Sequence, residues 1–179
     1  MSGHNKWSQI KHKKGASDAK RAKLFAKLLR AISIAAKTEA NPQFNPRLRS
    51  AVETARENLV PSDNIEKAIN KASEQKDLSE MTIEAYGPEG IAIIIQAVTD
   101  NTNRTISEVK KILSDHEAKF ANPGSVLWAF DAPVAGNPEA QWKAKFPQKI
   151  SENAQQKMEK LLEALDEHDD VQDVFTNIE

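Results

Sequence analysis

The chain has 179 residues, of which 39% are apolar and 28% are charged, a composition typical of soluble globular proteins. Cysteine is absent, which excludes disulfide bonds, thiolate zinc sites and a cysteine nucleophile. No apolar run approaches the roughly 18 residues needed to cross a bilayer, and the N-terminus lacks the apolar stretch of a secretory signal. We therefore expect no membrane partner and a cytoplasmic location.

Charge is distributed very unevenly, although the formal net charge is only −1. Residues 1–30 contain nine Lys or Arg and a single acid, whereas residues 151–179 contain nine acids and two lysines. Such asymmetry carries information about partners rather than about fold. The basic end therefore predicts a polyanionic partner.

The N-terminal part of the chain shows helical periodicity in three segments. In residues 17–38, apolar side chains recur on one face and cations gather on the opposite face. Two residues are exceptions, Arg21 among the apolar residues and Ile34 among the cations. Asn45 followed by Pro46 is a well-matched helix start, and Pro61 precedes a third amphipathic segment. Three such helices with short connections predict a small three-helix bundle.

After a polar linker, the periodicity changes to that of a sheet domain. The predicted strands are 81–86, 91–98, 125–130, 141–146 and 171–176. The predicted helices are 104–118 and a segment capped by Ser151. From residue 91 the order is strand, helix, strand, strand, helix, strand, which is the ferredoxin-like (βαββαβ) sandwich, with 81–86 as an extra edge strand. We predict an α+β protein with a basic arm and helical bundle at residues 1–78 and a ferredoxin-like domain at residues 79–179.

Several stretches resemble the sequence signature of the YebC family and occur in the family's order along the whole chain. They are GHNKWSQIKHKK at 3–14, DAKR at 18–21, NPRLR at 45–49, PSDNI at 61–65, YGP at 86–88, TDNTNRT at 99–105 and DDVQDV at 169–174. The family is usually described as probable transcriptional regulators that bind DNA, and it includes a mitochondrial translational activator of a cytochrome oxidase subunit. The resemblance therefore implies nucleic-acid binding in gene expression.

The resemblance also implies a third domain inserted into the second, and here the sequence departs from the family. Only the ten residues 131–140 stand where that insertion would be, so the flanking strands can be joined directly. We expect a short member without the inserted domain. Any partner surface that the inserted domain supplies would then be missing from this chain.

The basic arm and the cationic helix face are the strongest candidate site. Clustered cations bind polyphosphates because phosphate neutralisation releases counterions, and Trp7 among them could stack on an unpaired base. The alternatives are a solvated helix face and a Trp7 that packs the arm onto the bundle. The predicted nucleic-acid-binding residues are Lys6, Trp7, Lys11, His12, Lys13, Lys14, Lys20, Arg21, Lys23, Lys27, Arg30 and Arg104.

Two further segments have a functional and a structural interpretation. The loop 99–105 could hold a phosphate at a helix start with Arg104, or else Asn103 or Asp100 caps the helix and Arg104 pairs with an acid. The acidic run 166–170 is the only segment of the sequence that resembles a hydrolytic metal site. Its consecutive carboxylates diverge, so we expect a solvated turn, with an internal clamp on the basic arm as an alternative.

No phosphate-binding glycine loop, nucleophile elbow or dinucleotide fingerprint is present, so we predict no enzyme activity, cofactor, metal or small-molecule substrate. The predicted function is a nucleic-acid-binding regulator of gene expression, with duplex DNA or structured, including ribosomal, RNA as partner. The absence of a clear reading helix mildly favours structured RNA. The alternatives are a ribosome-associated translation factor and a protein-interaction module.

Overall fold

The computed structural model describes residues 18–72, 74, 77–134 and 141–179. Its helices are α2 (Asp18–Ala36), α3 (Pro46–Glu57), α4 (Ser62–Lys71), α5 (Thr102–Asp115) and α6 (Glu152–Asp166). Its strands are β1 (Ser79–Tyr86), β2 (Ala92–Thr99), β3 (Lys119–Phe120), β4 (Phe130–Asp131), β5 (Lys143–Ala144) and β6 (Val171–Thr176), and the 3-10 turns are η1 (Pro88–Gly90) and η2 (Leu127–Ala129). The predicted α+β class is confirmed. Across these described residues, none of the helices combines the length and apolarity that a membrane span requires.

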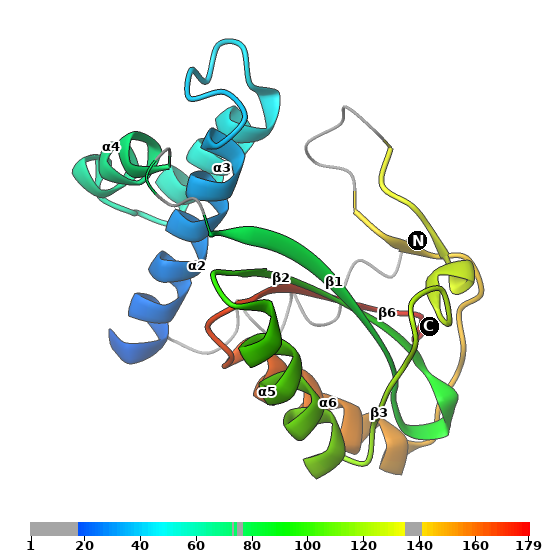
Figure 1. The fold of residues 1–179 in the computed structure, drawn as a ribbon. Helices are drawn as coiled ribbons and strands as arrows, with labels where there is room; N and C mark the ends of the chain where they lie inside the picture. Colours follow the sequence, from blue (N-terminus) through cyan, green and yellow to red (C-terminus); the bar gives the residue numbers. More distant parts are fainter. Residues whose placement is uncertain (1–17, 73, 75–76, 135–140) are drawn as a thin grey trace.

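Helices α2, α3 and α4 share one apolar core. Ile32 of α2, Leu48 of α3 and Ile65 of α4 are all buried in it. The predicted helix start at Asn45 is confirmed, because its side-chain oxygen accepts a hydrogen bond from the Leu48 N–H at 3.0 Å and Pro46 follows it. In Figure 1 these three helices lie together beside one end of the sheet.

The main sheet has the antiparallel order β3-β1-β2-β6. Strand β2 is buried on both faces, as its unbroken apolar run predicts. Ile93 and Ile95 belong to the core shared with Leu113 of α5 and Leu161 of α6, whereas Ile94 faces Val126 on the other side. Figure 1 shows α5 and α6 on the same face of the sheet. The two-helix layer of the predicted domain is therefore present.

Three strand predictions are corrected by the structure. The segment 81–86 is no edge strand, since β1 lies between β2 and β3. Its short connection to β2 makes a hairpin, with the Gly87 N–H bonded to the Ile91 carbonyl at 2.8 Å. On its other side β1 pairs with β3 at Ala85 and Tyr86, which removes it from the edge. Segments 125–130 and 141–146 contribute only the two-residue strands β4 and β5, which pair with each other outside the main sheet.

The physical reason for the second correction is that residues 125–130 cover the second face of the sheet instead of extending it. Val126, Ala129 and Phe130 are buried against Ala92 and Ile94 of β2. The backbone before η2 is turned because the buried carboxylate of Glu84 accepts hydrogen bonds from its N–H groups. The alternating apolar residues here belong to a packed turn. The apolar pattern alone cannot distinguish such a turn from a strand.

Candidate nucleic-acid interface

The cationic face of α2 lies against the sheet domain. Ile34, the apolar exception on that face, is buried with Leu78 and Val98. One turn further, Lys37 Nζ donates a hydrogen bond to the Leu78 carbonyl at 2.7 Å. The exception in the amphipathic pattern therefore marks the contact between the two parts of the chain.

Lys23 and Lys27 of α2 bind the C-terminal end of α6. Lys27 is 7% exposed, and its Nζ lies 3.0 Å from Asp166 Oδ1 and 2.5 Å from the Asp166 carbonyl. Lys23 Nζ donates to the Glu167 carbonyl at 2.9 Å. The last carbonyls of a helix lack intrahelical partners and carry its negative dipole end, so cations stabilise them.

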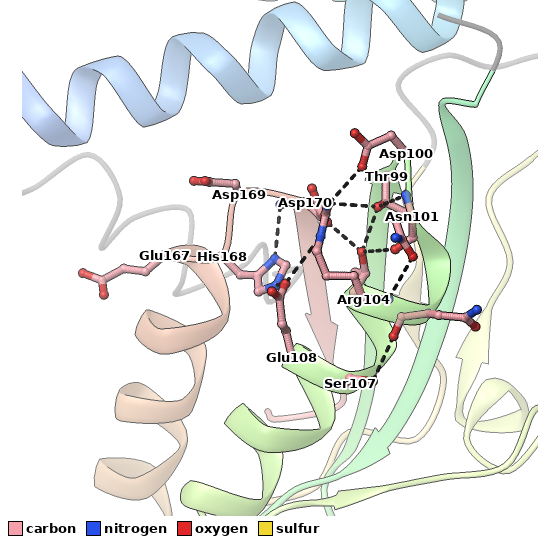
Figure 2. Close-up of polar contacts among 12 residues, drawn as sticks. Thr99, Asp100, Asn101, Arg104, Ser107, Glu108, Glu167, His168, Asp169 and Asp170 are labelled. Atoms are coloured by element: carbon pink, nitrogen blue, oxygen red, sulfur yellow. Dashed lines mark hydrogen bonds and ion pairs between the residues drawn. The ribbon is translucent and has the colours of Figure 1, made fainter.

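Asp170 is the centre of the contact between α2 and the sheet domain. Its carboxylate is 3% exposed and accepts hydrogen bonds from Arg30 Nη1 at 2.5 Å, Arg104 Nη2 at 2.8 Å and Thr105 Oγ1 at 2.6 Å. Arg30 also donates to the Asp169 carbonyl at 3.0 Å. One buried carboxylate thus joins α2, α5 and the turn before β6. Figure 2 shows the part of this cluster that comes from α5 and the turn.

The loop that precedes α5 has the structural role expected as the alternative to phosphate binding, in which it caps the helix and Arg104 pairs with an acid. Asn101 caps the helix, because its side-chain oxygen accepts from the Arg104 N–H at 3.1 Å, in place of the expected Asn103 or Asp100. Arg104 pairs with Asp170 and with Asp100 Oδ1 at 3.0 Å, as the alternative to phosphate binding expects. With Glu108 Oε2 at 3.9 Å from its Nε, the guanidinium already has three carboxylate partners.

The acidic run 166–170 is divided between buried and exposed positions. The expectation of a solvated turn is wrong for Asp170, because this carboxylate is buried by its arginine and threonine partners. Glu167 and Asp169 are exposed, and both point away from the Asp170 cluster in Figure 2. The structure therefore corresponds to the alternative interpretation, in which the acidic run forms an internal clamp. This clamp holds the described part of the basic region.

Glu108, His168 and Asp170 offer ligand atoms that lie within 4.8 Å of one another. Hydrogen bonds already occupy these groups, since His168 Nε2 lies 2.9 Å from Glu108 Oε2 and Asp170 binds two guanidinium groups. A metal ion would have to displace Arg30 and Arg104 from their carboxylate. The cluster is therefore organised as an ion-pair network, and it contributes to the joint between the two parts of the chain.

The ionisation of Asp170 provides a test of this network. Burial raises the pKa of Asp170, but hydrogen bonds from Thr105, Arg104 and Arg30 and the charge of Arg30 outweigh it and lower the pKa from 3.8 to about 2. A lowered native pKa stabilises the fold fully above the unfolded value, and this stabilisation is lost as the pH falls through about 2. We expect the difference in unfolding free energy between the wild type and Asp170→Asn to shrink from pH 5 to pH 2, measured by urea unfolding. A difference that is constant over this range would contradict the prediction.

The structure divides the predicted nucleic-acid-binding residues into three groups. The N-terminal ones lie outside the described residues; they are Lys6, Trp7, Lys11, His12, Lys13 and Lys14. Lys20 and Arg21 are exposed at the start of α2, where the Arg21 guanidinium lies 5.4 Å from the Phe25 ring centre. Lys23, Lys27 and Arg30 bind the sheet domain, so the open cationic face expected for α2 is corrected, and Arg104 pairs with acids within the sheet domain.

A groove of about 590 Å³ lies between α2, α4 and the loop that follows β2. Its charged lining is mixed and contains the cations Arg30, Lys67 and Lys71 and the acids Glu74, Asp77 and Asp100. Matched charges of both signs give no preference for an anionic ligand. The groove is therefore a feature of the joint and no second anion site.

Fold and contacts together define an α+β protein in which a helical part with a basic leading segment is bonded to the acidic turn of a sheet domain. The family model described as "TACO1/YebC protein N-terminal domain" matches residues 5–75, and the model described as "TACO1/YebC second and third domain" matches residues 78–136 and 133–178. The chain belongs to the TACO1/YebC family, which confirms the resemblance seen in the sequence.

Individual relatives agree with this assignment. A "Probable transcriptional regulatory protein" of Desulfosudis oleivorans is 44% identical over the whole chain, which covers 72% of that relative. A protein of the same name from Petrotoga mobilis is 51% identical over 73% of the chain and 54% of its own length. The crystal structure of a conserved hypothetical protein from Aquifex aeolicus matches 97% of the chain and 96% of its own, with a TM-score of 0.86 and 33% identity.

Proposed function

We propose that this protein is a non-enzymatic regulator of gene expression that binds nucleic acid through its basic N-terminal segment and the start of α2. The observation that carries the proposal is the charge of residues 1–21, which contain six Lys or Arg and one acid. Lys20 and Arg21 are exposed at the described end of this segment. The names of the relatives, probable transcriptional regulatory proteins, support the same role.

The ion pairs between α2 and the sheet domain reduce the set of cations that we assign to the proposed interface. Lys27 and Arg30 are held by Asp166 and Asp170, so the phosphate contacts are assigned to the residues before Lys23. We take residues 1–78 as the nucleic-acid-binding part and residues 79–179 as the domain that supports it. A cytoplasmic location belongs to the same proposal.

Structured RNA is favoured over a specific DNA sequence as the ligand. In a helix-turn-helix protein the N-terminal residues of the second helix enter the major groove. Helix α4 carries Asp63 in its first turn and Glu66 one turn later, and both repel phosphates. Recognition by backbone and shape suits a structured or ribosomal RNA, and therefore a role in translation, better than readout of a promoter.

Binding measured over a salt series tests the proposal. We expect the triple variant Lys11→Gln, Lys13→Gln, Lys14→Gln to bind duplex DNA with a shallower salt dependence. The slope of log K against log salt falls by about 0.9 for each phosphate that the protein no longer neutralises, because fewer counterions are released. Fluorescence anisotropy with a labelled duplex and with a ribosomal RNA fragment gives both affinities and slopes.

A matched control removes the same charge elsewhere. Arg49 and Arg56 of α3 and Lys71 of α4 are exposed, so Arg49→Gln, Arg56→Gln, Lys71→Gln changes the net charge equally. This control should keep the wild-type slope for both ligands. Equal losses of affinity in the two triple variants would mean that binding follows net charge alone, which would contradict a dedicated interface. Tighter binding of the RNA than of the duplex at equal salt would support translation over transcription.

A further inference from the structure

Two aromatic side chains are exposed side by side, one in the segment 125–130 that covers the second face of the sheet and one just after β5. Trp128 of η2 is 62% exposed and Phe146 is 52% exposed. Their ring centres lie 5.7 Å apart at an interplanar angle of 42°. Lys145 Nζ lies 5.8 Å from the centre of the Phe146 ring. Exposed aromatic surface of this kind is costly to solvate and marks an interaction site.

The pair is held in place before any ligand arrives. Trp128 Nε1 donates to the Ser125 carbonyl at 2.8 Å, which orients the indole. Ala129, next to Trp128, is fully buried, and its carbonyl accepts a hydrogen bond from the Lys145 N–H at 2.8 Å. That bond joins the two segments that carry the rings, so little ordering is needed when a flat ligand binds.

The charges around the rings indicate an anionic partner. Lys143, Lys145 and Lys149 are exposed, and the single acid among the described residues 125–134 and 141–149 is Asp131. Lys149 lies 3.6 Å from Glu179 in an exposed pair, where a phosphate can replace the carboxylate at small cost. Aromatic rings bordered by lysines suit a polymer with flat apolar groups on an anionic backbone.

We propose that Trp128 and Phe146 form a stacking platform for unpaired bases of single-stranded nucleic acid, with Lys143 and Lys145 contacting its phosphates. The segment that carries Trp128 packs on the face of the sheet opposite α5 and α6, where Val126, Ala129 and Phe130 are buried. The platform shares no residue with the basic N-terminal interface and goes beyond the function proposed above. A duplex cannot use it, because paired bases are already stacked on one another.

The test compares a labelled strand of about 20 nucleotides without self-pairing with the same strand annealed to its complement, by fluorescence anisotropy. We expect Trp128→Ala and Phe146→Ala each to weaken binding of the single strand about tenfold, with duplex binding unchanged. Trp128→Phe should restore most of the affinity, because a ring remains at that position. Phe44→Ala is the matched control, since Phe44 is 74% exposed in the connection between α2 and α3.

The result separates this proposal from the N-terminal interface. Unchanged single-strand affinity in both alanine variants would overturn the platform, and so would equal losses of affinity for strand and duplex or an equal loss in Phe44→Ala. A wild type that binds duplex and no single strand would overturn the platform while leaving the N-terminal interface supported. Thermal unfolding midpoints equal to that of the wild type, as expected for exposed rings, show that the variants are folded.

Discussion

Asp170→Ala is expected to lower the free energy of unfolding by about 2–3 kcal/mol, measured by urea unfolding at neutral pH. The variant leaves Arg30 and Arg104 without the buried carboxylate that both contact. Breaking a buried ion pair typically costs about 3–5 kcal/mol. The expected loss is smaller here because the two arginine side chains are 30% and 43% exposed and can be solvated again.

The neighbouring residue provides the control for this prediction. Asp169 carries the same charge one position earlier, and its side chain is exposed. Asp169→Asn should change the unfolding free energy by no more than about 0.5 kcal/mol, as is usual for surface positions. Equal effects of the two substitutions would show that local charge, and not the buried network, stabilises the turn.

Loss of Asp170 should also loosen the joint between the helical part and the sheet domain. Arg30 is bonded to the sheet domain through Asp170, the Asp169 carbonyl and the Val98 carbonyl at 3.3 Å. Without the carboxylate, we expect faster amide hydrogen exchange in α2 than in β2 relative to the wild type, because α2 can open locally. Uniform acceleration across both elements would indicate global destabilisation alone.

Glu84→Ala is expected to lower the unfolding free energy by about 3 kcal/mol, for a different reason. The Glu84 carboxylate is 5% exposed and accepts hydrogen bonds from the N–H groups of Gly124 at 2.5 Å, Val126 at 2.7 Å and Leu127 at 3.3 Å. Alanine would leave these donors without an acceptor, and a buried unsatisfied donor costs about 1–3 kcal/mol. Thermal or urea unfolding measures the loss of stability.

A second glutamate on the same strand serves as the control. Glu80 forms an exposed ion pair with Arg47, both side chains being about half exposed. Glu80→Ala should therefore cost no more than about 1 kcal/mol, the range of surface ion pairs. Glu84→Gln keeps one acceptor oxygen and should be destabilised less than Glu84→Ala. A Glu84→Ala variant as stable as Glu80→Ala would show that the turn does not depend on this carboxylate.

Helix-capping signals and helical periodicity predicted their elements correctly in this chain. The helix starts at Asn45 and Ser151 are confirmed by side-chain hydrogen bonds to the Leu48 and Ala154 N–H groups, since capping depends on residues within one turn. The last strand is also confirmed with the predicted bounds, Val171–Thr176. Amphipathic periodicity likewise located the helices of the N-terminal part, because burial of one face repeats every 3.6 residues.

The sequence did not show which helices, strands and turns contact one another when they lie far apart along the chain. Glu84 occupies a position that the strand pattern assigns to the polar face, yet it is buried because the 124–127 turn covers it. Ile34 is the one signal that could have revealed the contact of α2 with the sheet domain, since a lone apolar residue on a cationic face needs an apolar neighbour.

The amino-acid order alone therefore determined the class of fold, the N-terminal helices, the buried strand β2 and the family, because these follow from local periodicity, capping and residue identity. Only the tertiary structure decided which cations on α2 remain open. Lys27 and Arg30 have the same charge as Lys20 and Arg21, but they lie opposite the end of α6 and the Asp170 carboxylate, where Coulomb attraction and unpaired helix carbonyls hold them. The cations can be counted from the sequence, whereas the fold determines which acidic group lies beside each of them.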